Sequence, residues 1–194
     1  MKKSPSVQPQ LSYFIRPLEQ EDAPLLAAYY RRNRESHREW SPLAPADFFT
    51  TKVQRERLER GARLREEGRE IRFGMFTSAA ELIGTISLTS IERGVFQNGR
   101  FGYSIDAEYM GRGLMTAGLR KLIRYAFEDL GLHRLEANVM PRNAASARVL
   151  KKCGFRVIGH SPAMVQINGV WEGHDMYMLL AGEWRAHGRH IDPD

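Results

Sequence analysis

The chain alternates between two hydrophobic patterns, one typical of strands and the other of helices. In several short stretches apolar residues recur at every second position, as expected when one face of a strand is buried. The predicted strands are residues 12–18, 71–77, 82–91, 100–105, 135–139, 155–158, 163–167 and 171–180. A sheet is therefore predicted to form the centre of the protein.

Between these strands, apolar residues recur three and four positions apart, which is the spacing of one helix face. The best-defined stretch begins at Met115 and ends before Gly131. A second helix is predicted from Ala144 to Lys152, with Asn143 as its N-cap. Earlier helices are predicted at residues 22–33 and 47–67. These helices are expected to flank the sheet.

Two Asn-Gly pairs, Asn98-Gly99 and Asn168-Gly169, are strong signals for tight hairpin turns. They predict antiparallel pairing between the strands on either side of each turn. The remaining strands alternate with helices in the second half of the chain. The predicted fold class is therefore α/β (α+β), with a mixed central sheet flanked by helices.

The 194 residues fit one compact domain, which is predicted to span residues 11–182. Residues 1–10 are polar and contain two prolines, so we expect a disordered N-terminal lead. Residues 183–194 are predicted to be a polar C-terminal tail. The sequence contains no internal repeat.

The composition is 42% hydrophobic and 27% charged, with a formal net charge of +6. This excess favours anionic partners. Much of it lies at residues 31–38 and 52–72, where arginines alternate with glutamates. Mixed charges at helical spacing indicate a solvated helix face, with a substrate or RNA groove as the alternative.

No apolar run approaches the ~18 residues of a membrane span, and the N-terminus has no apolar signal segment. A cytoplasmic location, with no membrane contact, is predicted. The single Cys153 excludes an internal disulfide framework and is expected to be a small buried hydrophobe.

The candidate chemistry centres on residues 109–115, which connect the strand at residues 100–105 with the best-defined helix. Two glycines separated by one residue allow a sharp turn and a close approach to a ligand. The helix that follows directs free N–H groups and the positive end of its dipole toward that ligand. An anion is the expected occupant.

Two other phosphate-binding motifs do not match this turn. A dinucleotide fingerprint requires a third glycine where Thr116 stands, and an acid after the next strand, where residues 140–143 supply none. A P-loop requires Gly-Lys-Ser/Thr at the entrance to the helix, which residues 113–115 do not supply. A purely structural turn remains the alternative to a binding site.

A second segment, residues 143–155, narrows the identity of the ligand. It places an Asn cap, a Ser one turn later, a basic last turn and a Gly-Phe exit on one short helix. Together with the Arg-Gly-Leu turn at residues 112–114, it resembles the GCN5-related N-acetyltransferase (GNAT) superfamily, and the resemblance extends over residues 13–180. It implies the GNAT fold, with about seven strands in its sheet, and acetyl-CoA as the acyl donor.

Three shorter motifs resemble the RimJ branch of that superfamily, which acetylates the N-terminal amino groups of ribosomal proteins. They are Trp40-Ser41-Pro42, Gly102-Tyr103-Ser104-Ile105 and Asn168-Gly169-Val170-Trp171. The resemblance implies a small-subunit ribosomal protein as acceptor, with alanine as its expected first residue. It also implies a transient contact with the small ribosomal subunit or its RNA.

The same resemblance assigns roles to individual residues. The main-chain N–H groups of the turn would hold the pyrophosphate, and the strand before it would splay so that pantetheine pairs with its backbone. Asn143 and Ser146 would face the pantetheine arm and thiol, with a plain helix cap and a first-turn hydroxyl as the alternatives. The cofactor-binding set is Ser104, Ile105, Met110, Gly111, Arg112, Gly113, Leu114, Met115, Asn143 and Ser146.

The sequence departs from the superfamily motif at three positions. Met110 stands where Gln or Arg is usual, and Met115 stands where Gly or Ala is usual, although Met115 matches the RimJ branch. Binding is therefore expected to depend on main-chain amides. A recurrent acid of the last hairpin is replaced by Gly173, which leaves open the role of its neighbours Glu172, His174 and Asp175.

Acetyl transfer requires a neutral amine, a stabilised oxyanion and a proton for the departing thiolate. An N-terminal amine, with a pKa of ~7.7–8.0, needs a strong base less than a lysine does. We expect the amide near Ile105 to face the oxyanion and Ser146, or alternatively Tyr103, to protonate the thiol. The candidate bases by residue type are Glu92, Glu108, Glu136, His174 and Asp175, each more often a surface or paired group.

The acceptor is the part of the function that the sequence determines least. A small amine, such as a polyamine or an antibiotic, is an alternative acceptor. A basic factor for assembly of the small ribosomal subunit, with acetylation secondary, is an alternative of another class. No metal is expected, because His187 and His190 lie in the polar tail without an organised set of ligands. The oligomeric state stays open.

Overall fold

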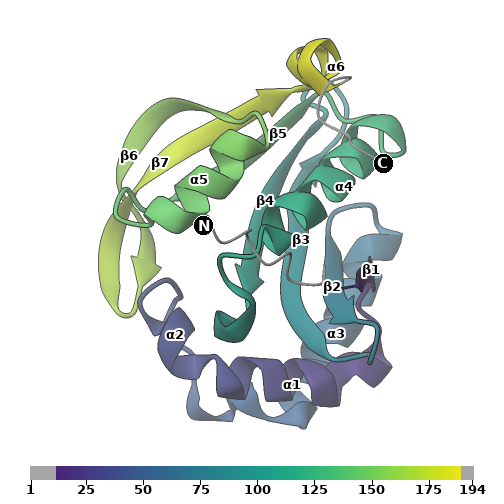
Figure 1. The fold of residues 1–194 in the computed structure, drawn as a ribbon, viewed down its shortest axis with the longest axis vertical. Coiled ribbons are helices and arrows are strands. Elements are labelled where there is room, and N and C mark those ends of the chain that lie inside the picture. The colour runs from purple at the N-terminus through teal and green to yellow at the C-terminus, as the bar shows by residue number, and fades with distance from the viewer. Residues whose placement is uncertain (1–11, 189–194) are drawn as a thin grey trace, which may run out of the picture.

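The computed structural model describes residues 12–188, so the predicted lead at residues 1–10 lies outside the described residues. Within residues 12–188, seven strands form one sheet in the order β1-β2-β3-β4-β5-β7-β6 (Figure 1). The strands are β1 (Tyr13–Pro17), β2 (Ile71–Thr77), β3 (Leu82–Glu92), β4 (Asn98–Ile105), β5 (Arg134–Val139), β6 (Arg156–Ile167) and β7 (Val170–Leu180). All neighbours pair antiparallel except β4 and β5, which are parallel. The predicted mixed sheet is confirmed.

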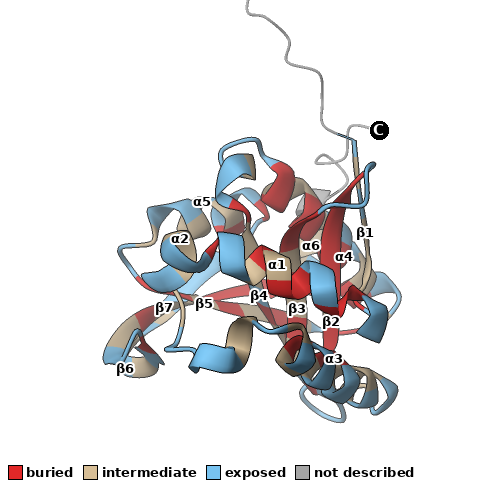
Figure 2. Ribbon diagram, turned by 90° about the horizontal axis from the view of Figure 1, so that it is seen from below, coloured by how far each residue is buried: buried red, intermediate tan, exposed pale blue. Residues whose placement is uncertain are grey.

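Helices cover both faces of this sheet. α4 (Leu114–Glu128) and α5 (Ala144–Lys152) lie on one face, and α3 (Thr51–Glu66) lies on the other (Figure 2). α4 forms the crossover between the parallel strands β4 and β5, a connection that parallel strands require. Its apolar side chains, such as Leu119 and Ile123, pack into the main core of the sheet, as their spacing predicted.

The two faces of the sheet differ because successive side chains of a strand point to opposite sides. In β3, Ile86 is fully buried in the core, whereas its neighbours Thr85 and Ser87 are only half-buried. The strand register places Thr85 beside Ser104 and Ser87 beside Gly102 of β4. The face opposite α4 is therefore polar near the end of β4.

The segment between β1 and β2 forms short helices along this polar face. α1 (Ala23–Arg32) is followed directly by α2 (Arg34–Arg38), which the sequence pattern did not predict. The helix predicted at residues 47–67 is divided into a 3₁₀ turn, η2 (Ala46–Phe49), and α3. Thr50 causes the break, because its backbone is extended and its side chain caps α3. α1 packs against both α3 and β3.

The pair Asn98-Gly99 was wrongly predicted to form a hairpin turn. Both residues belong to β4, and the turn lies before them, where Gly94 and Gln97 have φ of 67° and 45°. A β-carbon on Gly99 would lie 2.9 Å from Leu88 Cδ1. Glycine is therefore required there by close packing and not by a turn, although the predicted antiparallel pairing of β3 and β4 is confirmed.

The two strands predicted at residues 155–158 and 163–167 form one continuous strand, β6. Its register against β7 shifts at residues 157–159 and again at residues 161–165, and Ala163 has a φ of 48°. These bulges interrupt the alternation that the sequence pattern relies on. The predicted hairpin turn at Asn168-Gly169 is confirmed, with φ of 45° and 85°.

The polar tail predicted from residue 183 is corrected for its first residues, because Ala181–Gly188 form helix α6. Trp184 packs against Phe127 of α4, with ring centroids 5.5 Å apart. Ala181 is buried in the core and Glu183 pairs with Arg156, so α6 has several contacts that helical periodicity does not reveal. Residues 189–194 lie outside the described residues.

Cys153, at the end of α5, is buried as predicted. Its Sγ donates to the carbonyl of Thr116 at 3.6 Å, and burial raises the pKa of the thiol to about 11. None of the helices within residues 12–188 combines the length and the hydropathy needed to cross a membrane.

Candidate active site

The connection between β4 and α4 contains two glycines in the left-handed conformation. Gly111 has a φ of 75° and Gly113 a φ of 76°, a region that costs other residues roughly 1–2 kcal/mol. A β-carbon on either would meet no atom within 4 Å beyond the adjacent residues, so the conformation and not crowding requires glycine. α4 begins at the next residue, and its N-cap Gly113 offers no side chain. The N–H groups of the first turn therefore remain available to an anion.

The side chains of the other residues of the turn are buried, exposed or in contact with a ring. Leu114 and Met115 are buried in the core, and Met110 is 47% exposed. The Arg112 guanidinium lies over the ring of Tyr109, 5.2 Å from its centroid. This arrangement agrees with the expectation that main-chain amides, and not side chains, do the binding.

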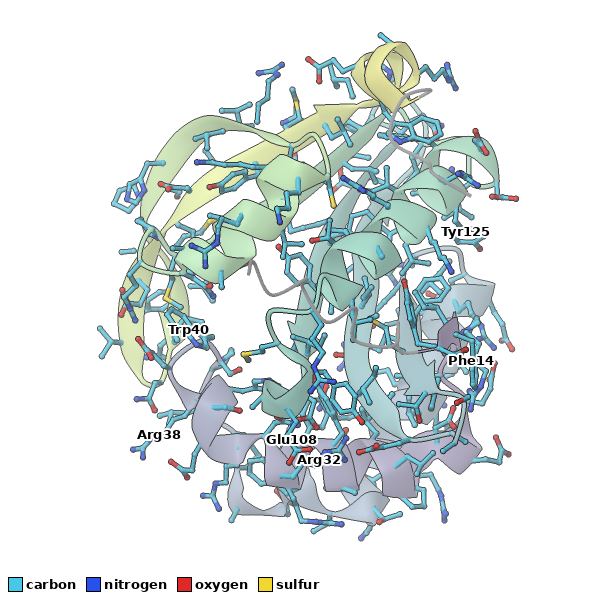
Figure 3. The ribbon with its side chains drawn as sticks, in the orientation of Figure 1. Phe14, Arg32, Arg38, Trp40, Glu108 and Tyr125 are labelled. Carbon is cyan, nitrogen blue, oxygen red and sulfur yellow. The ribbon has the colours of Figure 1, made fainter. Side chains whose placement is uncertain are left out.

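A buried carboxylate joins this turn to α1. Asp106 precedes the 3₁₀ turn η3 (Ala107–Tyr109) and accepts the N–H of Glu108 at 3.0 Å, the amide of Asn33 at 3.0 Å and the guanidinium of Arg32 (Figure 3). Burial raises the pKa of Asp106, but the hydrogen bonds from Asn33, Glu108 and Arg32 together bring it below its ordinary value. The carboxylate stays charged and fixes the turn relative to α1.

β4 and β5 separate soon after they begin to pair. Residues 98–100 pair with residues 134–136, and no pair follows, although β4 continues to Ile105 and β5 to Val139. Figure 1 shows the two strands diverging toward the glycine turn. Beyond Arg100, β4 pairs only with β3, so its other main-chain edge is open to an extended ligand. The predicted splay at Ser104 and Ile105 has the required geometry.

The first turn of α5 faces this opening. The Asn143 side chain caps α5 by accepting the N–H of Ser146 at 3.0 Å, so the cap role expected for asparagine is present. The hydroxyls of Tyr103 and Ser146 lie 2.9 Å apart. Burial raises the pKa of Tyr103, which keeps the phenol protonated. The structure therefore brings together the two residues predicted to protonate the thiolate.

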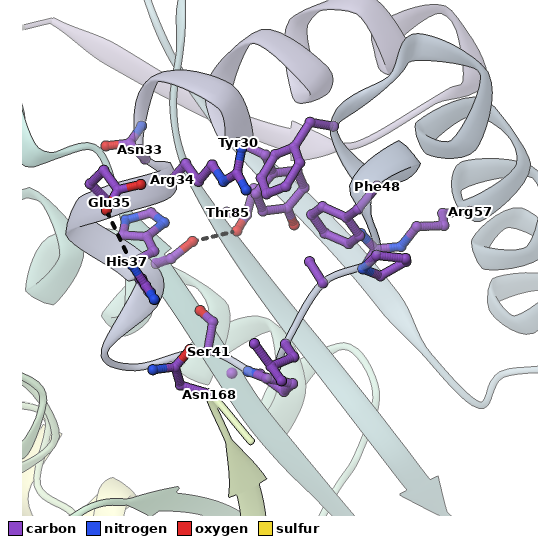
Figure 4. A pocket seen from close by; sticks show the side chains of 18 of the residues that line it. Tyr30, Asn33, Arg34, Glu35, His37, Ser41, Phe48, Arg57, Thr85 and Asn168 are labelled. Atoms are coloured by element: carbon purple, nitrogen blue, oxygen red, sulfur yellow. Dashed lines mark hydrogen bonds and ion pairs between the residues drawn. The ribbon is translucent and has the colours of Figure 1, made fainter. Parts of the chain in front are cut away.

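On the polar face of the sheet, a cavity of about 790 Å³ extends to the end of β4 (Figure 4). β2, β3 and β4 contribute to its floor, while α1, α2, α3 and the loop after α2 contribute to its walls. The Asn168 N–H donates to the carbonyl of Ser41 at 3.0 Å, which connects the β6–β7 hairpin to this loop. The charged residues that line the cavity, with His37, are Arg34, Glu35, Arg38, Arg57 and Arg72.

Hydrogen bonds connect the cavity to the splayed end of β4. The Ser104 hydroxyl lies 2.8 Å from the Tyr29 hydroxyl and 3.0 Å from that of Thr85. His37 Nε2 lies 2.9 Å from the carbonyl oxygen of Ile105. A carbonyl can only accept, so Nε2 carries the hydrogen, and Nδ1 of the neutral ring has a free lone pair.

The acids and histidine proposed from sequence as bases do not line this cavity. Glu136 is paired with Arg134 at 2.7 Å. Asp175 is paired with His160 at 2.9 Å, and the buried His174 donates from Nδ1 to the carbonyl of Glu172. Glu92, at the end of β3, and Glu108, in η3, are both exposed.

The glycine at the position of the usual hairpin acid has a packing explanation. A β-carbon on Gly173 would lie 2.7 Å from His160 Nε2. Its neighbour Glu172 is ion-paired with Arg142 at 2.8 Å, which lowers the pKa of the Glu172 carboxyl. Glu172 and Asp175 of this hairpin are therefore both paired, with Arg142 and His160 respectively.

Together, the glycine turn, the open edge of β4 and the Tyr103–Ser146 pair fit an extended donor with a phosphate at one end and a thioester at the other. A family model for the acetyltransferase (GNAT) domain matches residues 13–156. The chain belongs to the GNAT family, and it is an acetyl-CoA-dependent N-acetyltransferase.

Three known proteins are similar to this chain over most of its length. The probable N-acetyltransferase YjcK of Bacillus subtilis is 41% identical over 86% of this chain and 93% of its own length. The [ribosomal protein uS5]-alanine N-acetyltransferase of Escherichia coli is 31% identical over 88% of both chains. The crystal structure of the ribosomal-protein-S5-alanine acetyltransferase of Vibrio fischeri matches with a TM-score of 0.85 and 34% identity, over 89% of this chain and 94% of that one.

The histidine and the arginines of the cavity were not predicted as site residues from the sequence, whereas Tyr103 and Ser104, which also line it, were. His37 lies in a helix that was not predicted, and Arg57 and Arg72 lie in the stretch whose mixed charges indicated a solvated face. The alternative interpretation of that stretch, as the wall of a substrate groove, is the signal that would have found them.

Proposed function

We propose that this acetyltransferase modifies the N-terminal α-amino group of a protein, with alanine as first residue and a small-subunit ribosomal protein as acceptor. The relatives from Escherichia coli and Vibrio fischeri, which bear names with this acceptor, support the proposal. The relative from Bacillus subtilis has a name that does not specify an acceptor. The charge and the volume of the cavity therefore provide the structural support for one class of acceptor.

The observation that carries the proposal is the charge of that cavity. Four arginines line it, and Glu35 is the one acid among the described lining residues. A polyamine carries several positive charges and would be repelled at this surface. A protein N-terminus brings a single amine, and a pocket of this volume holds several residues of an extended chain. The cavity therefore favours a chain end over the small-amine alternative.

In this proposal His37 is the general base. Its Nε2–H is bonded to the carbonyl of Ile105, which leaves Nδ1 as the acceptor for the proton of the attacking amine. The ring lines the cavity and is attached to the splayed strand where the thioester is expected. Positioned bases of this kind contribute about 10²–10⁴-fold to a rate.

The remaining steps follow from the splayed strand and α5. A main-chain N–H near Ile105 stabilises the negative charge that develops on the thioester oxygen. As the nitrogen–carbon bond forms, the carbon–sulfur bond breaks and the amine gives one proton to His37. The hydroxyl of Ser146, supported by Tyr103, delivers one proton to the departing thiolate and regains one from solvent. His37 returns the amine proton to solvent, so the products are the acetylated amide and the free thiol of coenzyme A, with no net change in protons.

Intact-protein mass spectrometry of ribosomal proteins tests the acceptor. Cells with and without this protein are compared, and one small-subunit protein is expected to lose the mass of one acetyl group when the enzyme is absent. The acetyl group should return with the wild-type gene and not with a Gly113→Trp variant. An unchanged set of masses would overturn the ribosomal assignment.

A second assay separates the acceptor classes with purified enzyme. We expect a peptide with N-terminal alanine to be acetylated and spermidine to be left unmodified. Acetylation of spermidine alone would replace the proposed acceptor with a polyamine.

A further inference from the structure

The cavity contains a cation that the protein itself leaves without a carboxylate. Arg57 of α3 is half-buried, and its guanidinium lies 4.5 Å from the ring centroid of Phe48 and 5.7 Å from that of Tyr30. Its hydrogen-bond partners are neutral: the side chain of Gln54 at 3.2 Å and the Tyr30 hydroxyl. Glu70, the acid near it, is already bound by Arg72 Nε.

Such an arrangement is unfavourable unless an anion completes it. Removing a guanidinium from water is costly, and aromatic faces compensate only in part. Burial, more than any neighbouring charge, lowers the pKa of Arg57, although an arginine remains charged at neutral pH. Arg34, which lies over Phe49, adds a second cation without an ion pair among the described residues.

From this geometry we infer that the cavity binds a carboxylate of the acceptor chain, so that the preferred acceptor has an acidic residue shortly after its N-terminus. The inference rests on the proposed function, because it assumes that the acceptor is a peptide chain. It adds a selectivity for sequence beyond the first residue, with Arg57 as the main contact and Arg34 in support. Arg72, which is paired with Glu70, lies near Arg57 and marks that end of the cavity floor.

The sheet register sets the position of this acidic residue. Arg72 lies beside Ser87 and Ser87 beside Gly102, so these three form one row across β2, β3 and β4. Ser104, at the splay, is two residues farther along β4. With ~3.4 Å per residue along a strand and ~4.8 Å between strands, Arg72 lies about 12 Å from Ser104 across the cavity floor.

An extended acceptor chain covers this distance in three to four residues, at about 3.4 Å per residue. Since the side chains of glutamate and arginine add reach at both ends, the acid is expected between roughly the third and fifth positions. An acid at the second position would lie too close to the thioester, and one far beyond the fifth would lie outside the cavity.

The test uses peptides that begin with alanine and contain a single glutamate, moved from position two to position eight in a neutral background. The steady-state kcat/KM with saturating acetyl-CoA is measured for each peptide and for its glutamine counterpart. We expect glutamate at the third to fifth positions to raise kcat/KM about tenfold over glutamine, as a charge-assisted hydrogen bond would. The preference should fall at high salt.

Variants of Arg57 identify the contact. Arg57→Gln should remove the preference, measured as the ratio of kcat/KM for each glutamate peptide to that of its glutamine counterpart, and Arg57→Glu should transfer the preference to lysine peptides. Arg60→Gln, on the same helix but outside the cavity lining, is the matched control and should keep the wild-type preference. Far-ultraviolet circular dichroism and thermal melting check that the variants are folded.

The outcomes separate the inference from the proposed function. Equal rates for glutamate and glutamine peptides at every position, with active enzyme, would overturn the acidic selectivity and leave N-terminal acetylation standing. If acetyl-CoA binds but none of the peptides is acetylated, the proposed acceptor class fails, and the inference fails with it. A preference that persists in Arg57→Gln would overturn the assignment to this arginine.

Discussion

The two sides of the splayed strand β4 are built from different parts of the chain. On the side proposed for the acyl donor, here called the donor side, main-chain groups dominate: a glycine turn with φ of 75° and 76°, the first N–H groups of α4 and an unpaired strand edge. On the side proposed for the acceptor, here called the acceptor side, side chains dominate: arginines, aromatic rings and His37 around a cavity of about 790 Å³.

This difference explains what each side can recognise. Main-chain N–H groups bind a phosphate irrespective of the side chains around them, so the donor side suits a ligand that is shared by a whole family. Side chains can change without disturbing the sheet, so the acceptor side can be adapted to one partner. We expect substitutions on the donor side to affect every acceptor equally and substitutions on the acceptor side to discriminate among acceptors.

The largest effect is expected from Gly113→Trp. A tryptophan is strained at a φ of 76° and would cover the N–H groups of α4, so acetyl-CoA affinity should fall by about 10³-fold. Met110→Ala is the control, because this side chain is 47% exposed, and it should change affinity less than about threefold. Isothermal titration with acetyl-CoA measures both, and an equal loss in the two variants would contradict a site built from main-chain groups.

The next effect concerns the acceptor side. His37→Gln should lower kcat about 10²-fold at pH 7 without changing acetyl-CoA affinity, because it removes the base. The N-terminal amine has a pKa of ~7.7–8.0, so above that pH most of it is already neutral and the deficit should narrow. His160→Gln, an exposed histidine outside the cavity, is the control. A deficit that stays constant up to pH 9 would argue for a structural role of His37.

A smaller effect is expected where the two sides meet, at Asp106. Its folded-state pKa is below the ordinary value, so its contribution to stability is present above pH ~4 and is lost as the pH falls through the lowered pKa. Asp106→Asn should reduce the free energy of unfolding by about 2 kcal/mol at pH 7 and by less near pH 3. Urea denaturation at both pH values, with the exposed Asp129→Asn as control, measures the difference. A loss that does not depend on pH would contradict the charged network.

The smallest effect is expected at the thiol. Ser146→Ala should lower kcat about tenfold, because one proton donor is lost while the Asn143 side chain still accepts the main-chain N–H of residue 146 and caps α5. Tyr103→Phe should have a similar or smaller effect, and the double variant should be no worse than Ser146→Ala if the two hydroxyls serve one proton path. Single-turnover kinetics measure these rates, and fully additive losses would indicate two independent roles.

The donor side was predictable from the sequence because its signals are local. The glycines at positions 111 and 113, the helix after them and the Asn143 cap are each recognisable within a few residues, and the structure has all of them. Isothermal titration of the Gly113→Trp and Met110→Ala variants with acetyl-CoA tests whether these groups bind the coenzyme.

The acceptor side was not predictable, because its residues meet only through the fold. His37, Arg57 and Arg72 come from α2, α3 and β2, and the register of three strands determines that they share one cavity. Elsewhere in the fold, local signals were ambiguous: Asn98-Gly99 has the sequence of a turn, whereas Gly99 is needed for packing against Leu88. Periodicity likewise missed α6, in which Trp184 contacts Phe127.

The burial of Cys153 makes it possible to attach a label at one chosen position of the protein in solution. It is the one cysteine of the sequence, it is buried, and its pKa of about 11 leaves roughly one thiol in 10⁴ ionised at neutral pH. Maleimide and iodoacetamide reagents should therefore not modify Cys153 in the folded wild-type protein. A cysteine introduced at the exposed Val170, next to the hairpin turn that contacts the loop of the cavity, can then carry a fluorophore or spin label without a background signal, and motion near the acceptor side can be observed directly.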